Sequence, residues 1–191
     1  MLPWKLSRVT DRLYRSGQPR RSHLKQIEAA GIRTIINLRG LHPFPGQERW
    51  GQSCSQAGFT YIELPALSRG APQAWMIERL LEAYDRAKYP ALIHCKAGAD
   101  RTGFAAALYM HYHEGQDIAA AAADQLALKY GHFNIGKTGV LDFFFETFAA
   151  QTEVVEFDQW WRHYDHDALQ AEFERSSRSR IRLDRLLLRR A

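Results

Sequence analysis

The chain of 191 residues has the length of one domain with a short extension, and its 46% hydrophobic content excludes a disordered chain. Two cysteines cannot make a disulfide framework, and no apolar run approaches the roughly 18 residues that a membrane span needs. Lys and Arg number 26 against 21 Asp and Glu, which gives a net charge of +5.

The first half of the chain alternates strand-like and helix-like segments. Residues 9–19 predict a short strand that ends in a turn closed by Gly and Pro. Ser22 can cap a helix that runs to about Ala30 and stops at Gly31. Further strands are predicted over 32–38, 59–64 and 91–93, and further helices over 47–57, 72–88 and from 104 onward.

This alternation predicts an α/β fold with a central, mostly parallel sheet flanked by helices on both faces. Ligands of such sheets bind beyond the carboxyl ends of the strands. Arg39, the turn at 68–70 and the segment that begins at Cys95 each follow a predicted strand. We therefore expect them to converge at one rim of the sheet.

The second half is predicted to be helical. Asp117 caps an Ala-rich helix that is expected to end near Tyr130, and a loop over 132–137 leads to a helix over 138–150. We assign residues 1–150 to a catalytic domain and 151–191 to a helical extension whose aromatic residues pack on it. The Arg-rich end fits either a basic amphipathic helix at a membrane surface or a solvated or packed terminal helix.

The charge excess belongs to this tail. Residues 175–191 hold seven arginines and one aspartate, so the surplus of six leaves the remainder near neutral. We therefore expect no nucleic-acid partner.

The most informative segment is His94-Cys95-Lys96-Ala97-Gly98-Ala99-Asp100-Arg101-Thr102-Gly103, between the 91–93 strand and an Ala-rich helix. A tight loop at a strand-to-helix junction turns its backbone N–H groups inward, and the helix dipole adds positive potential. Such a concavity binds a tetrahedral oxyanion, which Arg101 can hold with two parallel hydrogen bonds. A positive field favours the thiolate of Cys95, so we expect Cys95 to be a nucleophile.

The string His-Cys-x-x-Gly-x-x-Arg-Thr-Gly resembles the phosphate-binding loop of the cysteine-based phosphatases, the protein tyrosine and dual-specificity group. The order of a Leu-Tyr-Arg-Ser-Gly-Gln-Pro turn, an Asn-Leu-Arg segment and the Cys loop is similar to atypical dual-specificity phosphatases of bacteria and fungi. This resemblance covers about residues 9–150. It implies a dual-specificity phosphatase-like fold.

The loop supports hydrolysis of a phosphomonoester in two steps through a cysteinyl-phosphate on Cys95. Loop N–H groups and Arg101 stabilise the equatorial oxygens, and Thr102 can donate to the sulfur when it leaves. His94 is expected to hold the loop backbone, with a direct base role as the alternative. No metal or other cofactor is required, because no His, Cys and Asp cluster has ligand spacing.

The leaving oxygen also needs a proton, which in most of the family comes from an aspartate on the loop after the preceding strand. Here that loop, residues 64–72, holds no acid. Asp100 is the candidate, because an Asp-Arg pair in this position is similar to myotubularin-type lipid phosphatases. A carboxyl group beside a phosphate dianion keeps its proton more readily, which suits an acid. The alternatives for Asp100 are a structural ion pair or a helix cap.

Several residues are candidates for substrate binding: Lys96, Ala97, Gly98, Ala99, Arg39 and Arg69. Lys96 either adds positive charge beside the pocket, as in relatives with multiply phosphorylated substrates, or points to solvent. Cys54 is expected to be a buried helix residue, with a redox partnership with Cys95 as the alternative.

The leading hypothesis is therefore a phosphatase acting on phosphotyrosine, phosphoprotein or phosphoinositide-like substrates. An RNA 5′-triphosphatase and a phosphate-binding adaptor without turnover are the alternatives. A working thiolate and an N-terminus without a signal-peptide core point to the cytoplasm, with peripheral attachment to an anionic membrane through the tail.

Overall fold

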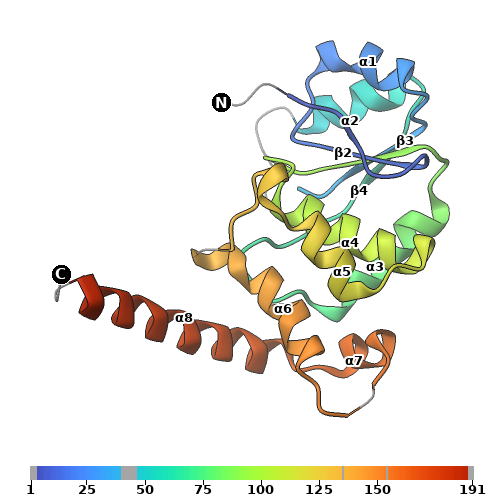
Figure 1. Ribbon diagram of the computed structural model, residues 1–191. Helices are drawn as coiled ribbons and strands as arrows, with labels where there is room; N and C mark the ends of the chain where they lie inside the picture. The colour runs from blue at the N-terminus through green and yellow to red at the C-terminus, as the bar shows by residue number, and fades with distance from the viewer. Residues whose placement is uncertain (1–3, 40–46, 135, 154, 189–191) are drawn as a thin grey trace.

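The computed structural model describes residues 4–39, 47–134, 136–153 and 155–188, with residues 47 and 178–188 as backbone only. In this part of the chain one five-stranded sheet has the order β1-β2-β5-β3-β4 (Figure 1). The strands are β1 Ser7–Arg8, β2 Leu13–Ser16, β3 Thr34–Asn37, β4 Thr60–Glu63 and β5 Ala91–His94. Only the pairing of β1 with β2 is antiparallel among these strands, which confirms the predicted mostly parallel sheet.

Helices cover both faces of this sheet, as predicted (Figure 1). Helices α1 and α2 lie on one face, and α3, α4 and α5 lie on the other. The helices are α1 Leu24–Ala29, α2 Gln47–Gln56, α3 Ala74–Arg86, α4 Asp100–Glu114, α5 Ile118–Gln125, α6 Val140–Ala149, α7 Phe157–His163 and α8 His166–Leu188.

The alternation of side chains along the central strands builds a core on each face. Ile35 of β3 and Leu92 of β5 join a smaller cluster with residues of α1 and α2. The next residues, Ile36 and Ile93, join the larger cluster under α3, α4 and α5. Because successive strand side chains point to opposite faces, four-residue strands fill both cores.

Several predicted boundaries were wrong. The short strand predicted within 9–19 is β2, which ends before Gly17 as expected but begins only at Leu13, because residues 9–12 form the turn that joins it to β1 and the amides of Val9 and Thr10 donate to the Leu13 carbonyl. Ser22 caps no helix, since a 3₁₀ turn precedes α1 and its N-terminal bond runs from the Arg20 amide to the His23 ring.

Helix α5 is shorter than predicted. Asp117 caps it as expected, with its carboxylate accepting from the Ala120 amide at 2.9 Å, but it ends at Gln125 rather than near Tyr130. The carbonyl of Gln125 accepts instead from the guanidinium of Arg15 at 3.0 Å. The Gln125 carbonyl, at the end of the helix, is thus bonded to a residue far away in the sequence. A separate 3₁₀ turn follows over Leu128–Tyr130.

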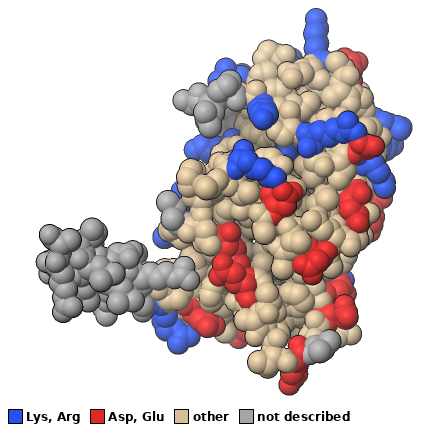
Figure 2. All heavy atoms as spheres, viewed as in Figure 1, with Lys and Arg blue, Asp and Glu red and all other residues tan. Residues whose placement is uncertain are grey.

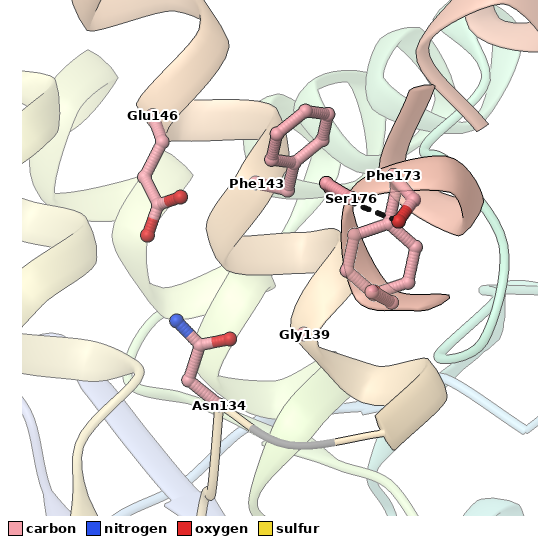
Figure 3. A pocket seen from close by; sticks show the side chains of 7 residues that line it. Asn134, Gly139, Phe143, Glu146, Phe173 and Ser176 are labelled. Carbon is pink, nitrogen blue, oxygen red and sulfur yellow. Dashed lines mark hydrogen bonds between the residues drawn. The ribbon is translucent and has the colours of Figure 1, made fainter. Parts of the chain in front are cut away.

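The C-terminal helices add their first turns to the larger core. Phe157 and Trp161 of α7 and Leu169 of α8 are buried in it. Phe173 of α8 packs on Phe143 of α6 with ring centroids 5.7 Å apart (Figure 3). Beyond these contacts α8 runs away from the body (Figure 1), and most side chains of the Arg-rich end lie outside the described residues.

Charge is distributed unevenly on the visible face. In Figure 2 Lys and Arg are most frequent over the part that carries the sheet, whereas Asp and Glu are concentrated over the helices below it. Within the described residues, no helix has the length and apolarity needed to cross a bilayer.

Candidate active site

The register of the sheet places the ends of β2, β3 and β5 side by side at one rim. His94, the last residue of β5, pairs with Ser16 of β2 on one side and with Asn37 of β3 on the other. The chain segments that follow these three residues therefore leave the sheet together. Two backbone bonds tie them, from Gln18 N to Lys96 O at 3.1 Å and from Leu38 N to His94 O at 2.9 Å.

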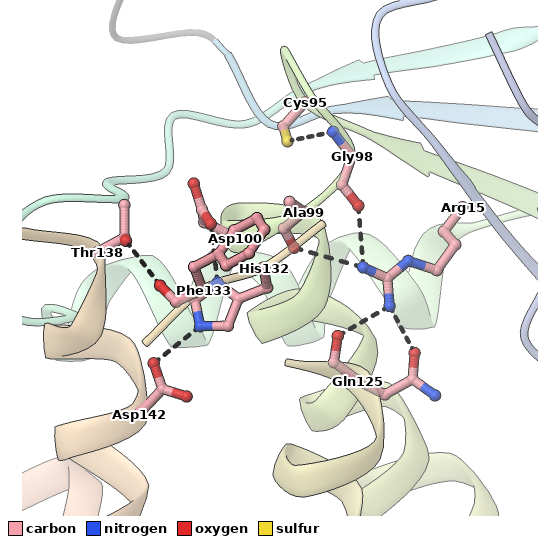
Figure 4. A network of polar contacts seen from close by, with 10 residues as sticks. All are labelled: Arg15, Cys95, Gly98, Ala99, Asp100, Gln125, His132, Phe133, Thr138 and Asp142. Atoms are coloured by element: carbon pink, nitrogen blue, oxygen red, sulfur yellow. Dashed lines mark hydrogen bonds and ion pairs between the residues drawn. The ribbon is translucent and has the colours of Figure 1, made fainter. Parts of the chain in front are cut away.

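The segment that follows β5, residues 95–101, is called here the Cys95 loop. Its turn depends on Gly98, whose φ of +79° is a conformation that L side chains rarely adopt. A Cβ on Gly98 would also lie 2.5 Å from the backbone nitrogen of Gly17. The Gly98 N–H donates to Sγ of Cys95 at 3.2 Å (Figure 4), so this amide points into the loop.

Two arginines accompany Cys95. Arg101 is half-buried in the first turn of α4 and donates to the carbonyl of Leu38 at 3.3 Å. Arg39 donates to the side-chain carbonyl of Gln18 at 2.9 Å. Burial and the like charge of Arg101 lower the pKa of Arg39, while Cys95 acts in the opposite direction. Arg39 thus lies within electrostatic reach of both Cys95 and Arg101, as the strand order predicted.

The outer side of the Cys95 loop is held by Arg15, which sequence reasoning passed over. Its guanidinium donates to the carbonyls of Gly98 and Ala99 at 2.9 and 3.3 Å (Figure 4). It also donates to the side chain of Gln125 at 2.8 Å and stacks on Tyr130. Burial lowers the pKa of Arg15 to about 10, with Tyr130 and Cys95 acting in the opposite direction. The group therefore stays charged at neutral pH.

His94 is fully buried beneath the loop. Its Nε2 accepts from the indole N–H of Trp50 at 3.3 Å. Burial lowers the pKa of His94 to about 3, and the charges of Arg39 and Arg101 act in the same direction. A neutral ring with Nε2 occupied fits a structural position better than that of a base.

The remaining predicted residues divide into buried and exposed groups. The hydroxyl of Thr102 is buried and has no hydrogen-bond partner among the described residues, so it remains available to a ligand or to the sulfur. Lys96 and Ala97 are exposed, and Ala99 is buried. Arg69 is exposed on the 64–72 loop, which is tied to α8 by a bond from Ala71 N to the Gln170 side chain.

The two cysteines lie in different environments. Cys95 belongs to the larger hydrophobic cluster and Cys54, on α2, to the smaller cluster across the sheet. Both thiols are free, and burial raises the pKa of Cys54 to about 12. Cys54 is thus a buried helix residue, as expected from the sequence.

Asp100 is the first residue of α4 and is joined to a histidine from far along the chain. Its Oδ1 lies 2.8 Å from Nδ1 of His132, and Nε2 of the same ring lies 2.8 Å from Oδ2 of Asp142 (Figure 4). Burial works against a charge on this ring, but the bonds and charges of both carboxylates outweigh it and raise the pKa of His132 to about 9. Neither His132 nor Asp142 has a spacing to the Cys95 loop that sequence reasoning could have used.

Comparison with protein families gives one model match. The family described as "Swiss Army Knife protein, DSP-PTPase phosphatase domain" (PTP-SAK) matches residues 9–132, which include Arg15, the whole Cys95 loop and His132. Asp142 lies beyond the matched region.

The curated relatives of this chain are also named as phosphatases. "Dual specificity protein phosphatase TpbA" of Pseudomonas aeruginosa is 29% identical over 119 residues, 61% of this chain and 50% of that protein. The chain thus spans about half the length of the curated relatives it matches.

Two solved structures share the fold. A crystal structure of P. aeruginosa TpbA in complex with pTyr has a TM-score of 0.53 at 23% identity and covers 87% of this chain and 88% of that one. A structure of PTPMT1 in complex with PI(5)P has a TM-score of 0.55 at 15% identity and covers 76% and 97%.

Proposed function

The chain belongs to the PTP-SAK family of DSP-PTPase phosphatase domains, and we propose that it is a cysteine-dependent phosphatase that hydrolyses phosphomonoesters. The observation that carries this proposal is the bond from the Gly98 amide to Sγ of Cys95 at 3.2 Å. An amide that points to the sulfur also points to the position where a phosphoryl oxygen would lie, and such inward N–H groups bind an oxyanion.

In the first step the Cys95 thiolate attacks phosphorus in line with the leaving oxygen. A sulfur–phosphorus bond forms and the ester phosphorus–oxygen bond breaks. The leaving oxygen takes the bond's electron pair and a proton from the carboxyl group of Asp100. The carboxylate of Asp100 remains.

In the second step water attacks the cysteinyl-phosphate. The carboxylate of Asp100 accepts a proton from the water, the sulfur leaves as thiolate, and inorganic phosphate is released. The Thr102 hydroxyl, buried without a partner among the described residues, can donate to the departing sulfur. The residues return to their starting state, so no co-reactant besides water is needed.

Charge on the transferring group is stabilised in both steps. The Cys95 loop amides and Arg101 surround the equatorial oxygens, and Arg39 adds positive potential at the same rim. The current bond of Arg101 to the Leu38 carbonyl is long, at 3.3 Å, and a bidentate bond to a phosphoryl group would replace it.

The proposed substrates are phosphotyrosine and other phosphoproteins or phosphoinositide-like lipids. One structural neighbour was solved with pTyr and another with PI(5)P, so both kinds of substrate fit this fold. The exposed cations Lys96 and Arg69 would favour a substrate with more than one phosphate. A panel of phosphopeptides, phosphoinositides, inositol phosphates and RNA triphosphate ends would rank these classes.

The test of the activity is vanadate-sensitive release of phosphate from 4-nitrophenyl phosphate. We expect wild-type protein to turn over, and Cys95→Ser to lose turnover while still binding vanadate. Cys54→Ser is the matched control, because Cys54 is also a buried thiol but lies across the sheet, and it should retain turnover. Vanadate binding without turnover in the wild type would identify an adaptor and overturn the proposal.

We further propose that the protein works in the cytoplasm, where a catalytic thiol stays reduced, and that the arginine-rich tail attaches it to anionic membranes. The seven arginines of residues 175–191 would bind anionic headgroups, and leucines of the same segment would insert. Sedimentation with anionic vesicles should pellet the full chain but not a chain that ends at Arg175. Equal pelleting would contradict attachment through the tail.

A further inference from the structure

His132 is a buried histidine held between two carboxylates beside the Cys95 loop. Its side chain is 1% exposed, whereas the side chains of Asp100 and Asp142 are 28% and 16% exposed. The two distances, from Nδ1 to Asp100 and from Nε2 to Asp142, are both 2.8 Å. The ring thus connects the first residue of α4, directly before Arg101, to the first turn of α6.

Each ring nitrogen faces one carboxyl oxygen, which can accept a hydrogen bond whether or not the other oxygen of that group carries a proton. A neutral imidazole has one N–H donor, whereas an imidazolium has two. The geometry therefore fits an imidazolium that donates to both aspartates. Its pKa of about 9 agrees with this arrangement.

The bond at Asp100 occupies one of its two carboxyl oxygens. Oδ1 accepts from the His132 ring, so a proton that Asp100 gives or receives is carried on Oδ2. In Figure 4 the Asp100 carboxyl group lies on the Cys95 side of the His132 ring. A carboxyl group that is still partly exposed is thereby fixed in one orientation next to the anion site.

We propose that His132 is a positioning residue that orients the Asp100 carboxyl group for proton transfer, and that Asp142 keeps the ring protonated and in place. This inference rests on the proposed phosphatase function. It explains how an acid on the Cys95 loop could work without the usual aspartate loop, because the 64–72 segment contains no Asp or Glu. Misplacing a proton donor by about 1 Å costs on the order of a hundredfold in rate.

The alternative is a structural link that only holds α4 to α6. A purely structural link would slow all substrates alike when removed, since it would disturb the whole Cys95 loop. A positioning residue instead affects substrates according to how much their leaving oxygen needs a proton. The two roles therefore differ in the leaving-group dependence of the rate.

The experiment compares phenyl phosphate, whose leaving group needs a proton, with 4-nitrophenyl phosphate, whose leaving group needs little. We expect His132→Leu to lower kcat on phenyl phosphate by about tenfold to a hundredfold more than on 4-nitrophenyl phosphate. Asp100→Asn should show the same pattern, and the double variant should be no slower than the slower single one. His132→Asn, whose amide can donate in place of Nδ1, should restore part of the rate.

The control is His111→Asn, since His111 is a half-buried histidine on α4 whose Nδ1 lies 2.8 Å from the Gln116 carbonyl and not beside Asp100 or Asp142. It should leave the ratio of the two substrates unchanged. Asp142→Asn removes one of the two charges that hold the proton on His132. It should lower the pKa of His132 measured by imidazole nitrogen NMR.

Equal losses on the two substrates, or additive losses in the double variant, would overturn the positioning role and leave the phosphatase intact. Absence of vanadate-sensitive turnover in the wild type would overturn the proposed function and this inference with it. These outcomes are distinguishable in one set of assays.

Discussion

At the scale of single residues, Gly98 determines the shape of the candidate site. Its positive φ and its approach to the Ser16–Gly17 backbone are both required for its amide to point at Cys95. A side chain there would meet backbone rather than the flexible end of another side chain. The chain must therefore move the loop to accommodate any other residue.

We predict that Gly98→Ala abolishes vanadate binding and turnover, because the new Cβ would displace the amide that contacts the sulfur. The matched control is Gly58→Ala, since Gly58 has φ +85° but nothing within 4 Å of its Cβ position. Both variants should lose about 1 kcal/mol or more of stability in urea unfolding, but only Gly98→Ala should lose vanadate affinity. Retained affinity in Gly98→Ala would contradict this account of the loop.

At the scale of elements, Arg15 joins the end of β2, the Cys95 loop and the end of α5. Arg15 is a cation with 1% exposure, and it contacts backbone carbonyl oxygens, the side-chain oxygen of Gln125 and the ring of Tyr130. Arg15 binds the loop carbonyls on the outer side of the Cys95 loop. The N–H edge of the same peptide groups therefore faces the anion site.

We predict that Arg15→Met weakens vanadate binding and lowers the free energy of unfolding by about 2 kcal/mol or more, because several buried carbonyls lose their donor. Arg12→Met is the control, since Arg12 also stacks on a tyrosine, Tyr89, but is exposed, and its stacking partner lies outside the Cys95 loop. Calorimetric vanadate titration and urea unfolding measure the two effects. Unchanged affinity in Arg15→Met would show that the loop keeps its shape unaided.

The elements also show what the sequence could and could not predict. The strands around Ile35 and Ile93 and the Cys95 loop were predictable, because hydrophobic runs and turn residues are local signals. The early end of α5 was not, since it depends on Arg15, which is 110 residues away in sequence.

The candidate site also contains some residues that the sequence could predict and others that it could not. The positions of Cys95 and Arg101 follow from one contiguous motif. The contact of His132 with Asp100 spans 32 residues and arises only when α4 and α6 pack, so no local pattern indicated it. Trp50, which donates to His94, is likewise brought in by the packing of α2.

At the scale of the whole molecule, the C-terminal helices share the larger hydrophobic core of the part that contains the sheet. Trp161 of α7 is fully buried and donates from its indole nitrogen to the hydroxyl of Tyr112 on α4 at 2.6 Å. Phe144 of α6 lies in the same aromatic group as Trp160 and Phe157. The described start of the extension is therefore expected to unfold together with the sheet.

We predict that Trp161→Ala lowers the free energy of unfolding by about 3–5 kcal/mol, because it leaves a large cavity in the core. Trp75→Ala, at a tryptophan that is 37% exposed, should cost much less. Urea unfolding followed by circular dichroism should show a single transition in both. A separate early transition in Trp161→Ala would mean that the extension folds independently.

The stability of the whole molecule should depend on His132. Its folded pKa of about 9 lies above the ordinary value of 6.5, so the folded state binds a proton more tightly than the unfolded state. The contribution, on the order of 3 kcal/mol, is fully present below pH 6.5 and is lost as the pH rises through 9. Urea unfolding at pH 7 and pH 9.5 measures it.

Asp142→Asn should shift this loss of stability to lower pH, since the ring then keeps one charged partner. The difference between wild type and variant should therefore be larger at pH 7 than at pH 9.5. An equal difference at both pH values would contradict a charged His132 in the folded protein.

The central claim is that Cys95, Arg101 and the inward amides of one loop form a single site for a phosphoryl group. A crystal structure with vanadate tests it most directly. We expect vanadium bonded to Sγ of Cys95, with its equatorial oxygens bound by the Cys95 loop amides and by both terminal nitrogens of Arg101. Vanadate bound elsewhere, or an empty loop with Arg101 still on the Leu38 carbonyl, would contradict the account.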